Sequence, residues 1–136
     1  MVRKARFDMQ QFFQALADNT RLRLLNLMAD QEVCVCYFVE ILGGPQPKIS
    51  RHLAYLRNAG IVSVRREGKW MHYRIVLPPH IGATQILRQT LDWMKEDKAM
   101  QADRARLTQA CCAPAKYDLE GAPVPVSVAE PCCEVH

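Results

Sequence analysis

The stretch that decides the expected fold is residues 46–62, which read QPKISRHLAYLRNAGIV. Pro47 suits the first position of a helix, because the N–H that it lacks would have no partner there. Gly60 suits the position that follows a helix end. Ile49, Leu53 and Leu56 recur at helical spacing, so the stretch predicts a helix with one face packed on a core. The opposite face carries basic or hydrogen-bonding side chains: Lys48, Arg51, His52 and Tyr55.

The flanking residues place this helix in a larger pattern. Helical spacing of apolar residues predicts helices at about 6–17, 20–29, 33–43 and 80–98. Residues 61–66 and 70–76 alternate and are rich in β-prone residues, with Glu67-Gly68 between them as a hairpin turn. The order is therefore ααααββα, a mainly α (α+β) fold. Helices 33–43 and 46–58, joined through Gly43-Gly44, form a helix-turn-helix, and the hairpin makes it a winged one.

Charge is concentrated in the same part of the chain. The net charge of the whole chain is +4, but residues 44–76 alone hold seven Lys or Arg residues and a single acidic residue, Glu67. A concentrated basic segment on a helix and hairpin indicates a nucleic-acid partner. Arg and Lys can hydrogen-bond guanine edges in the major groove, and hydroxyl and imidazole groups can bond base edges or phosphates. We therefore expect double-stranded DNA to contact Lys48, Ser50, Arg51, His52, Tyr55, Arg65, Arg66 and Lys69.

Length and composition limit the remaining possibilities. With 136 residues, 49% of them hydrophobic, the chain should form one packed domain. No stretch approaches the ~20 apolar residues of a membrane helix, and no apolar segment follows the basic N-terminus. We therefore expect a cytoplasmic protein without a membrane partner. Residues 1–98 form the expected DNA-binding domain. Residues 99–136 form a tail rich in proline and cysteine that is expected to be poorly ordered and flexible, although 99–110 could extend the last helix.

An enzymatic function has little support. The sequence contains no glycine-rich phosphate loop, no nucleophile elbow and no paired-carboxylate arrangement. Its cysteines do not form a Cys-x-x-Cys motif in a βαβ context. We therefore expect a protein that is not an enzyme and holds no permanently bound cofactor.

Four segments closely resemble the ArsR/SmtB family of metal-responsive bacterial repressors. They are LADNTRLRLLNLM, EVCVCYFVEIL, QPKISRHLAYLRNAGIV and RREGKWMHYRI, and the resemblance covers about residues 7–98. The resemblance implies a homodimeric winged helix-turn-helix that represses DNA until metal binds. It also implies that the first and last helices form the dimer interface, so residues 1–98 would carry dimerisation as well. Such a dimer would bind a pseudo-palindromic operator.

The segment EVCVC occupies the position of the arsenic-sensing motif of that family. Thiolates select soft, thiophilic ions. Cys34 and Cys36 converge only if Cys34 is extended and Cys36 lies near the start of the third helix, where a thiol pKa also falls. The arsenic motif of the family reads Cys-x-Cys-x-x-Cys, but its third position is Val39 here. Trivalent arsenic prefers three sulfur ligands, so this departure leaves the ligand set open.

Three ligand sets remain open. A tail cysteine could complete the site with Cys34 and Cys36, or the inducer could need two sulfurs, as methylarsenite would. Alternatively, the inducer could bind wholly in the tail, on Cys111, Cys112 and one of Cys132 or Cys133. Of these we expect Cys34, Cys36, Cys111 and Cys112 to be the ligands, in reduced form.

The leading hypothesis is a DNA-binding repressor released by As(III) or Sb(III) species: arsenite, methylarsenite or antimonite. The first alternative is the same fold responding to cadmium, lead or thiol oxidation. The second alternative is a thiol-rich protein that sequesters metal and has an incidental basic face. Salt-dependent binding to its own promoter would separate a repressor from a sequestering protein, because phosphate contacts make DNA binding depend on salt.

Overall fold

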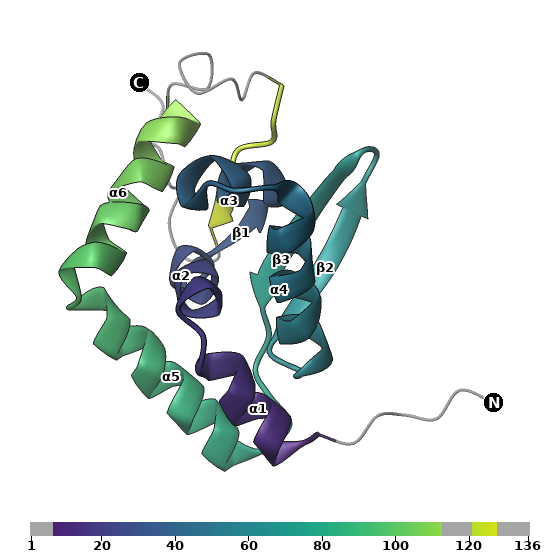
Figure 1. Cartoon of the computed structure of the whole chain (residues 1–136), viewed down its shortest axis with the longest axis vertical. Helices are drawn as coiled ribbons and strands as arrows, with labels where there is room; N and C mark the ends of the chain where they lie inside the picture. The colour runs from purple at the N-terminus through teal and green to yellow at the C-terminus, as the bar shows by residue number, and fades with distance from the viewer. Residues whose placement is uncertain (1–6, 113–120, 128–136) are drawn as a thin grey trace.

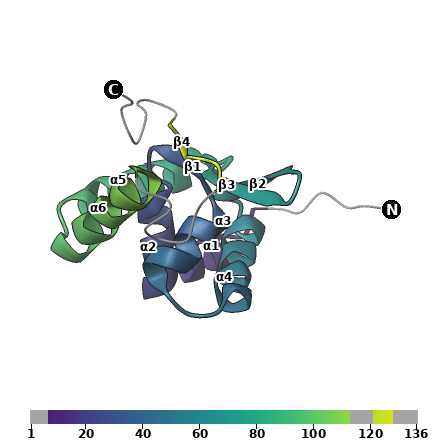
Figure 2. The ribbon, with the colours of Figure 1, turned by 90° about the horizontal axis from the view of Figure 1, so that it is seen from above.

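The computed structural model describes residues 7–112 and 121–127. Two helices, α1 (Met9–Leu16) and α2 (Asn19–Leu27), are followed by the short strand β1 (Gln31–Cys34). The helices α3 (Val35–Leu42) and α4 (Gln46–Asn58) precede a hairpin of β2 (Val62–Glu67) and β3 (Trp70–Ile75). The chain continues through α5 (Ile81–Lys95), α6 (Lys98–Cys112) and β4 (Val126–Ser127). Figures 1 and 2 show the β2–β3 wing extending away from the side of the molecule that α5 and α6 cover.

Local sequence explains where the helices begin and end. The Asp8 and Asp18 carboxylates accept hydrogen bonds of 3.0 Å from the third backbone N–H that follows each of them, and so cap α1 and α2. Between α3 and α4 the chain turns through Gly43 (φ 75°) and Gly44 (φ 87°). These backbone angles are disfavoured for residues with a Cβ atom, so the turn of the helix-turn-helix depends on this glycine pair.

The sheet has the order β2-β3-β1-β4, and every neighbouring pair is antiparallel. In the pairing of β1 with β3, Cys34 lies opposite His72 and Val33 lies opposite Tyr73. Residues on a strand alternate between the two faces. Val33, Tyr73, Val62 and Val64 therefore share the face that packs on the core, whereas Cys34 and His72 share the other face.

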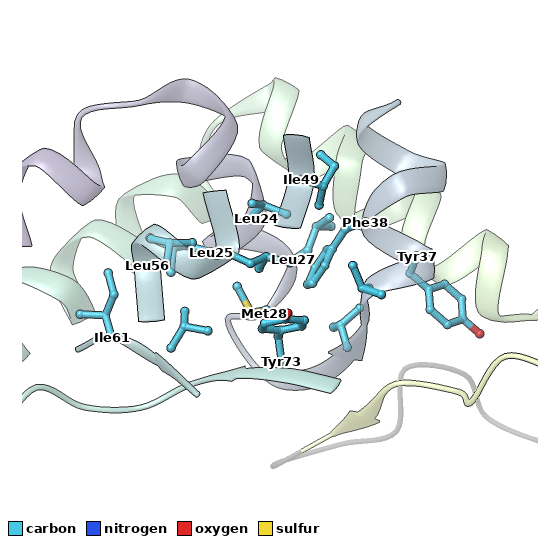
Figure 3. Packing of buried hydrophobic residues seen from close by; sticks show 14 of the residues in the cluster. Leu24, Leu25, Leu27, Met28, Tyr37, Phe38, Ile49, Leu56, Ile61 and Tyr73 are labelled. Carbon is cyan, nitrogen blue, oxygen red and sulfur yellow. The ribbon is translucent and has the colours of Figure 1, made fainter. Parts of the chain in front are cut away.

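The core lies between this sheet and the helices α2, α3 and α4 (Figure 3). Helix α2 lies in its middle: Leu24, Leu25 and Leu27 are buried, and so is Met28, which follows the helix. Phe38 of α3 and Tyr73 of β3 meet with ring centroids 6.4 Å apart. Burial of these side chains supplies the main driving force for folding. The labelled core residues are Leu24, Leu25, Leu27, Met28, Tyr37, Phe38, Ile49, Leu56, Ile61 and Tyr73.

The structure departs from the expected order ααααββα, and from the expected positions of the hairpin turn and of Pro47. The strand β1 was not predicted as an element, because its four residues are too few for a periodic pattern and its partner β3 is remote in sequence. The strand β4 lies in the stretch expected to be an unstructured tail. The hairpin turn is Gly68-Lys69 rather than Glu67-Gly68, because Glu67 still pairs with Trp70. Pro47 occupies the second helical position, since α4 begins at Gln46.

Residues 98–112 form a separate helix, α6, rather than the poorly ordered start of a tail. Asp103 is 1% exposed, and its Oδ2 lies 2.7 Å from Nε of Arg23 on α2. The Asn26 side chain donates a 2.9 Å hydrogen bond to the Met100 carbonyl oxygen. Leu107 is also buried. Met100, Ala110 and Cys111 are buried as well, so apolar packing and these long-range polar pairs together hold α6. The polar pairs leave no signal in the local sequence.

Within residues 7–112 and 121–127, none of the helices combines the length and the apolar character needed to cross a membrane.

Candidate DNA-reading surface and thiol site

Helices α3 and α4 form the expected helix-turn-helix. Ile49, Leu53 and Leu56 turn inward, each 2% exposed or less. Lys48 and Arg51 are exposed and make no ion pair with another described residue. Together with the half-buried Ser50, they present two cations and a hydroxyl group on the outer face of α4. This chemistry suits contact with phosphates and guanine edges.

His52 and Tyr55, expected on the same face, are half-buried and held by other helices. The Arg21 guanidinium of α2 lies 4.3 Å from the centre of the Tyr55 ring. Its Nη1 lies 3.3 Å from Nδ1 of His52. The Tyr55 hydroxyl donates a 2.9 Å hydrogen bond to Oε1 of Gln14 on α1. The sequence could not show these contacts, because Gln14 and Arg21 lie more than 30 positions from their partners on α4.

The wing carries three expected cations in different environments. Arg65 is tied to β1, with Nη2 2.7 Å from Oε1 of Glu32, and its Nη1 lies 3.7 Å from Oε2 of Glu67. Arg66 donates a 3.2 Å hydrogen bond to the Gly68 carbonyl oxygen at the wing tip. Lys69 lies 4.9 Å from the centre of the Trp70 ring. All three side chains are exposed, but Arg65 is paired with two carboxylates in the middle of the wing, whereas Arg66 and Lys69 make no ion pair with a described residue at its tip.

The Cys34 and Cys36 side chains come together as expected. Cys34 is extended (φ −70°, ψ 143°) and is the N-cap of α3, so the chain changes direction between the two residues. The Cys36 thiol donates a hydrogen bond to Sγ of Cys34 across 3.0 Å. Cys34 is fully buried, and Cys36 is partly exposed. The result is a dithiol whose outer member can be reached from solvent.

This geometry makes the two thiols unequal. The hydrogen bond from Cys36, helped by backbone N–H groups and His72, outweighs burial and lowers the pKa of Cys34 from 9.0 to about 6. The same contact and burial raise the pKa of the Cys36 thiol, because Cys36 supplies the shared proton. At neutral pH the pair is thus one thiolate and one thiol, and the thiolate is a nucleophile that can bind a thiophilic ion.

We expect Cys34 to titrate far below an ordinary cysteine. Ultraviolet thiolate absorbance of the folded protein should rise through a step near pH 6, and Cys34→Ser should lack that step. Since folding lowers this pKa, ionisation stabilises the fold. That stabilisation is complete above pH 9.0 and is lost as the pH falls through about 6. A wild-type titration with no step below pH 8 would contradict this assignment. Cys111→Ser, which removes another buried cysteine, is the control and should keep the step.

A row of polar groups connects this dithiol with the wing. His72 lies opposite both Cys34 on β1 and Arg65 on β2, so these side chains share one face of the sheet. The His72 ring is 2% exposed, and its Nε2 lies 3.2 Å from Oε1 of Glu67. Glu67 and Glu32 both contact Arg65. The pairing of Arg65 lowers the pKa of Glu32, so this carboxylate stays charged. His72 therefore packs within the wing.

Of the described tail cysteines, neither Cys111 nor Cys112 joins the dithiol. Cys111 is buried on α6, where its thiol donates a 3.3 Å hydrogen bond to the Thr108 carbonyl oxygen. Cys112 is disulfide-bonded, contrary to the reduced state expected for it. The described part of the chain contains no group of three or more His, Cys, Asp or Glu side chains that could hold a metal ion. Cys132 and Cys133 lie outside the described residues.

Helices α1 and α5 leave several large apolar side chains exposed. Ile81 is 78% exposed, and Trp93 is 75% exposed. Met9, Phe13 and Ile86 are also exposed, and a groove of about 340 Å³ runs between the two helices. By contrast, Leu87 and Met94, which are also on α5, are buried within the protomer. We call the five exposed residues, Met9, Phe13, Ile81, Ile86 and Trp93, the α1–α5 apolar surface.

Other proteins resemble this chain in both sequence and fold. Residues 18–64 match the family model described as bacterial regulatory protein, arsR family. The chain is 43% identical to the arsenical resistance operon repressor of Escherichia coli (strain K12), over 75% of this chain and 86% of that protein. It is 39% identical to the arsenic resistance transcriptional regulator ArsR1 of Pseudomonas putida, over 72% of this chain and 80% of that protein.

Among solved structures, the chain resembles the AntR antimony-specific transcriptional repressor. The TM-score is 0.50 and the identity 26%, over 71% of this chain and 90% of that one. The two sequence relatives are 43% and 39% identical to this chain over 75% and 72% of its length. Proteins that share only a fold need not be this similar in sequence. The chain therefore belongs to the arsR family of bacterial regulatory proteins: it is a winged helix-turn-helix transcriptional repressor of the metal- and metalloid-responsive type, and not an enzyme.

Proposed function

We propose that the protein is a homodimeric repressor that leaves its operator when a trivalent arsenical or antimonite binds Cys34 and Cys36. The observation that carries this proposal is the pair of thiols 3.0 Å apart where β1 meets the first helix of the helix-turn-helix. Soft thiolates favour thiophilic ions over hard cations. The names of the arsenical and antimony repressors that resemble this chain support the same inducer class.

In this proposal, α4 enters the major groove and the wing tip contacts the backbone. Lys48, Arg51 and Ser50 face outward on α4, and Arg66 and Lys69 extend from the wing. His52 and Tyr55 remain part of the reading face, in positions set by α1 and α2. Arg65 acts at the edge of this surface through its pair with Glu32. Because the target is operator DNA, the protein would act in the bacterial cytoplasm.

The α1–α5 apolar surface is the proposed dimer interface. Several large apolar side chains exposed on two neighbouring helices usually mark an interaction site. Two copies related by a two-fold axis would present two α4 helices to one face of DNA. The operator would then be pseudo-palindromic, with half-sites about one helical turn apart.

The structure suggests how inducer binding would reach the DNA-reading surface. An arsenical that bonds both sulfurs replaces the 3.0 Å hydrogen bond and constrains the first turn of α3, which packs against α4. It also removes the thiolate charge opposite His72 on the wing strand. Both elements that contact DNA are therefore adjacent to the inducer site, so a small local change can shift both.

Inorganic arsenite requires a third ligand in this proposal. Cys111 or Cys112 would supply it, which requires the end of α6 to rearrange and the disulfide of Cys112 to be reduced. Binding one ion by Cys36 and a tail cysteine would close a long loop of chain. The entropy cost of closing a loop grows slowly with its length, so this cost is tolerable. Methylarsenite has one valence already bonded to carbon, so Cys34 and Cys36 would satisfy it alone.

Titration of the operator complex tests the inducer class. The reduced protein on its own promoter fragment would receive arsenite, methylarsenite, antimonite, cadmium, lead or zinc, and release would be followed by fluorescence anisotropy. We expect release by the trivalent arsenicals and antimonite, and none by zinc. Release by cadmium, lead or a thiol oxidant alone would replace this inducer class by the first alternative. Failure to bind the promoter at all would favour metal sequestration.

Two substitutions test the DNA-reading surface. Arg51→Ala should weaken operator binding sharply and relax base preference, because a base-edge contact is worth about 1–3 kcal/mol. Lys69→Ala should weaken binding to all sequences alike and flatten its salt dependence, as loss of a phosphate contact does. Filter binding across salt concentrations measures both effects. Wild-type affinity in Arg51→Ala would show that the outer face of α4 does not read DNA.

A further inference from the structure

Arg21 makes an unusual number of contacts for a residue outside the helix-turn-helix. Its Nε and Nη2 donate hydrogen bonds of 3.1 and 2.8 Å to the carbonyl oxygens of Ala15 and Gln14, at the end of α1. Its Nη1 lies 3.3 Å from Nδ1 of His52, and its plane covers the Tyr55 ring. One guanidinium therefore joins the end of α1 to two residues on the reading face of α4.

The chemistry of this contact determines where the His52 proton lies. A guanidinium only donates hydrogen bonds, because it has no acceptor atom and stays protonated in proteins. The contact between Nη1 and Nδ1 is therefore a hydrogen bond only when Nδ1 is unprotonated. The Asp18 carboxylate would favour the opposite tautomer, but its Oδ2 is 3.8 Å from Nδ1, beyond hydrogen-bond distance. The neutral ring consequently carries its proton on Nε2.

The Nε2 atom of His52 is available to a ligand. It makes no hydrogen bond with any described residue. The Nε2 atom is not buried, so solvent reaches it. The ring belongs to α4, between the exposed Arg51 and the core residue Leu53. A fixed N–H donor at this place can meet an acceptor on DNA.

We propose that Arg21 is a positioning residue for DNA reading: it holds His52 as the Nε2–H tautomer and directs that N–H at a hydrogen-bond acceptor of the operator. This inference rests on the proposed reading of DNA by α4. The acceptor is an oxygen or nitrogen of a base edge or a phosphate oxygen, which the same N–H can serve. By anchoring the ring to the end of α1, Arg21 also sets the orientation of this donor relative to the proposed dimer interface.

The tautomer is tested on the free protein, without DNA. Nitrogen NMR of the protein with labelled histidine should show His52 with a protonated Nε2 and an unprotonated Nδ1 at neutral pH. Arg21→Ala should remove this preference, whereas Arg88→Ala, which removes the same charge from the exposed face of α5, should not. An Nδ1–H tautomer in the wild type would overturn the proposal, even if the protein binds its operator as proposed.

Operator binding tests the role of the donor with two variants of His52. In His52→Gln the amide N–H₂ reaches the place of Nε2, whereas in His52→Asn the amide reaches only the place of Nδ1 and accepts from Arg21. We expect His52→Gln to retain most of the affinity and His52→Asn to lose about tenfold, as for one lost hydrogen bond. Equal affinity of the two variants would overturn the donor role without touching the proposed inducer response.

Two further measurements distinguish the sources of the acceptor. If the N–H contacts a base edge, His52→Asn should lose affinity for the operator but not for unrelated DNA. If it contacts a phosphate, the loss should be equal on both. Circular dichroism and arsenite-triggered release show whether Arg21→Ala is folded, and so separate misfolding from mispositioning of His52. A folded Arg21→Ala variant with wild-type operator affinity would also overturn the proposal.

Discussion

Replacing both Cys34 and Cys36 with serine should produce a repressor that stays on its operator at any arsenical concentration. The two hydroxyl groups fit where the thiols lie, but they do not bond arsenic as thiolates do. Operator affinity in the absence of inducer should remain close to that of the wild type, because neither sulfur is on the outer face of α4. Anisotropy of the operator complex during titration with methylarsenite and arsenite measures both properties.

The size of the lost response follows from allosteric coupling. Coupling free energies of about 1–3 kcal/mol correspond to 5–150-fold weaker operator binding in the induced wild type. The double serine variant should show no weakening. The double variant Cys111→Ser, Cys112→Ser provides the matched control: it should keep the response to methylarsenite and lose the response to inorganic arsenite. A double serine variant that still releases DNA with arsenite would place the inducer site wholly in the tail.

Introducing charge into the α1–α5 apolar surface should abolish dimerisation and, with it, tight operator binding. The double variant Ile81→Glu, Trp93→Glu puts two carboxylates on side chains that are 78% and 75% exposed, so the protomer itself should still fold. A monomer binds one half-site and loses the gain of two linked contacts, about 10²–10⁴-fold in affinity. Sedimentation velocity and operator binding at one protein concentration measure the two effects together.

The control is Leu77→Glu, which charges an equally apolar residue that is 51% exposed but lies outside α1 and α5. It should remain dimeric. These point variants are sharper than deletion of residues 80–98, because Leu87 and Met94 of α5 belong to the core of the protomer. A wild-type protein that sediments as a monomer while binding its operator tightly would refute the proposed interface.

The helix-turn-helix and wing could be predicted because their signals are local. The apolar spacing of Ile49, Leu53 and Leu56, the paired glycines 43 and 44 and the alternating hairpin each depend on neighbours within a few positions. The convergence of Cys34 and Cys36 was also predictable, since it needs only a change from extended to helical backbone between adjacent residues. Membership of the arsR family, confirmed by the relatives, followed from the same local segments.

Contacts between distant residues were beyond prediction from one sequence. Helix α6 has few large apolar residues, and its place depends on the pair between Arg23 and Asp103, 80 positions apart. The partners of Arg65, His52 and Tyr55 come from β1, α1 and α2. These contacts turn three residues that appeared as free DNA ligands into groups held by the fold.

The fold class, the basic face of α4 and the Cys34–Cys36 motif could be inferred from sequence, because periodicity, turn residues and residue chemistry act over short distances. What each polar group can do depends on contacts made by the folded chain. The tertiary structure placed Cys34 opposite His72 on the wing strand, buried Leu87 and Met94 while leaving Trp93 exposed, and brought Arg21 against His52. Burial, ion pairing and the direction of a hydrogen bond all depend on which distant residues come into contact when the chain packs. One amino-acid sequence does not show which residues these are.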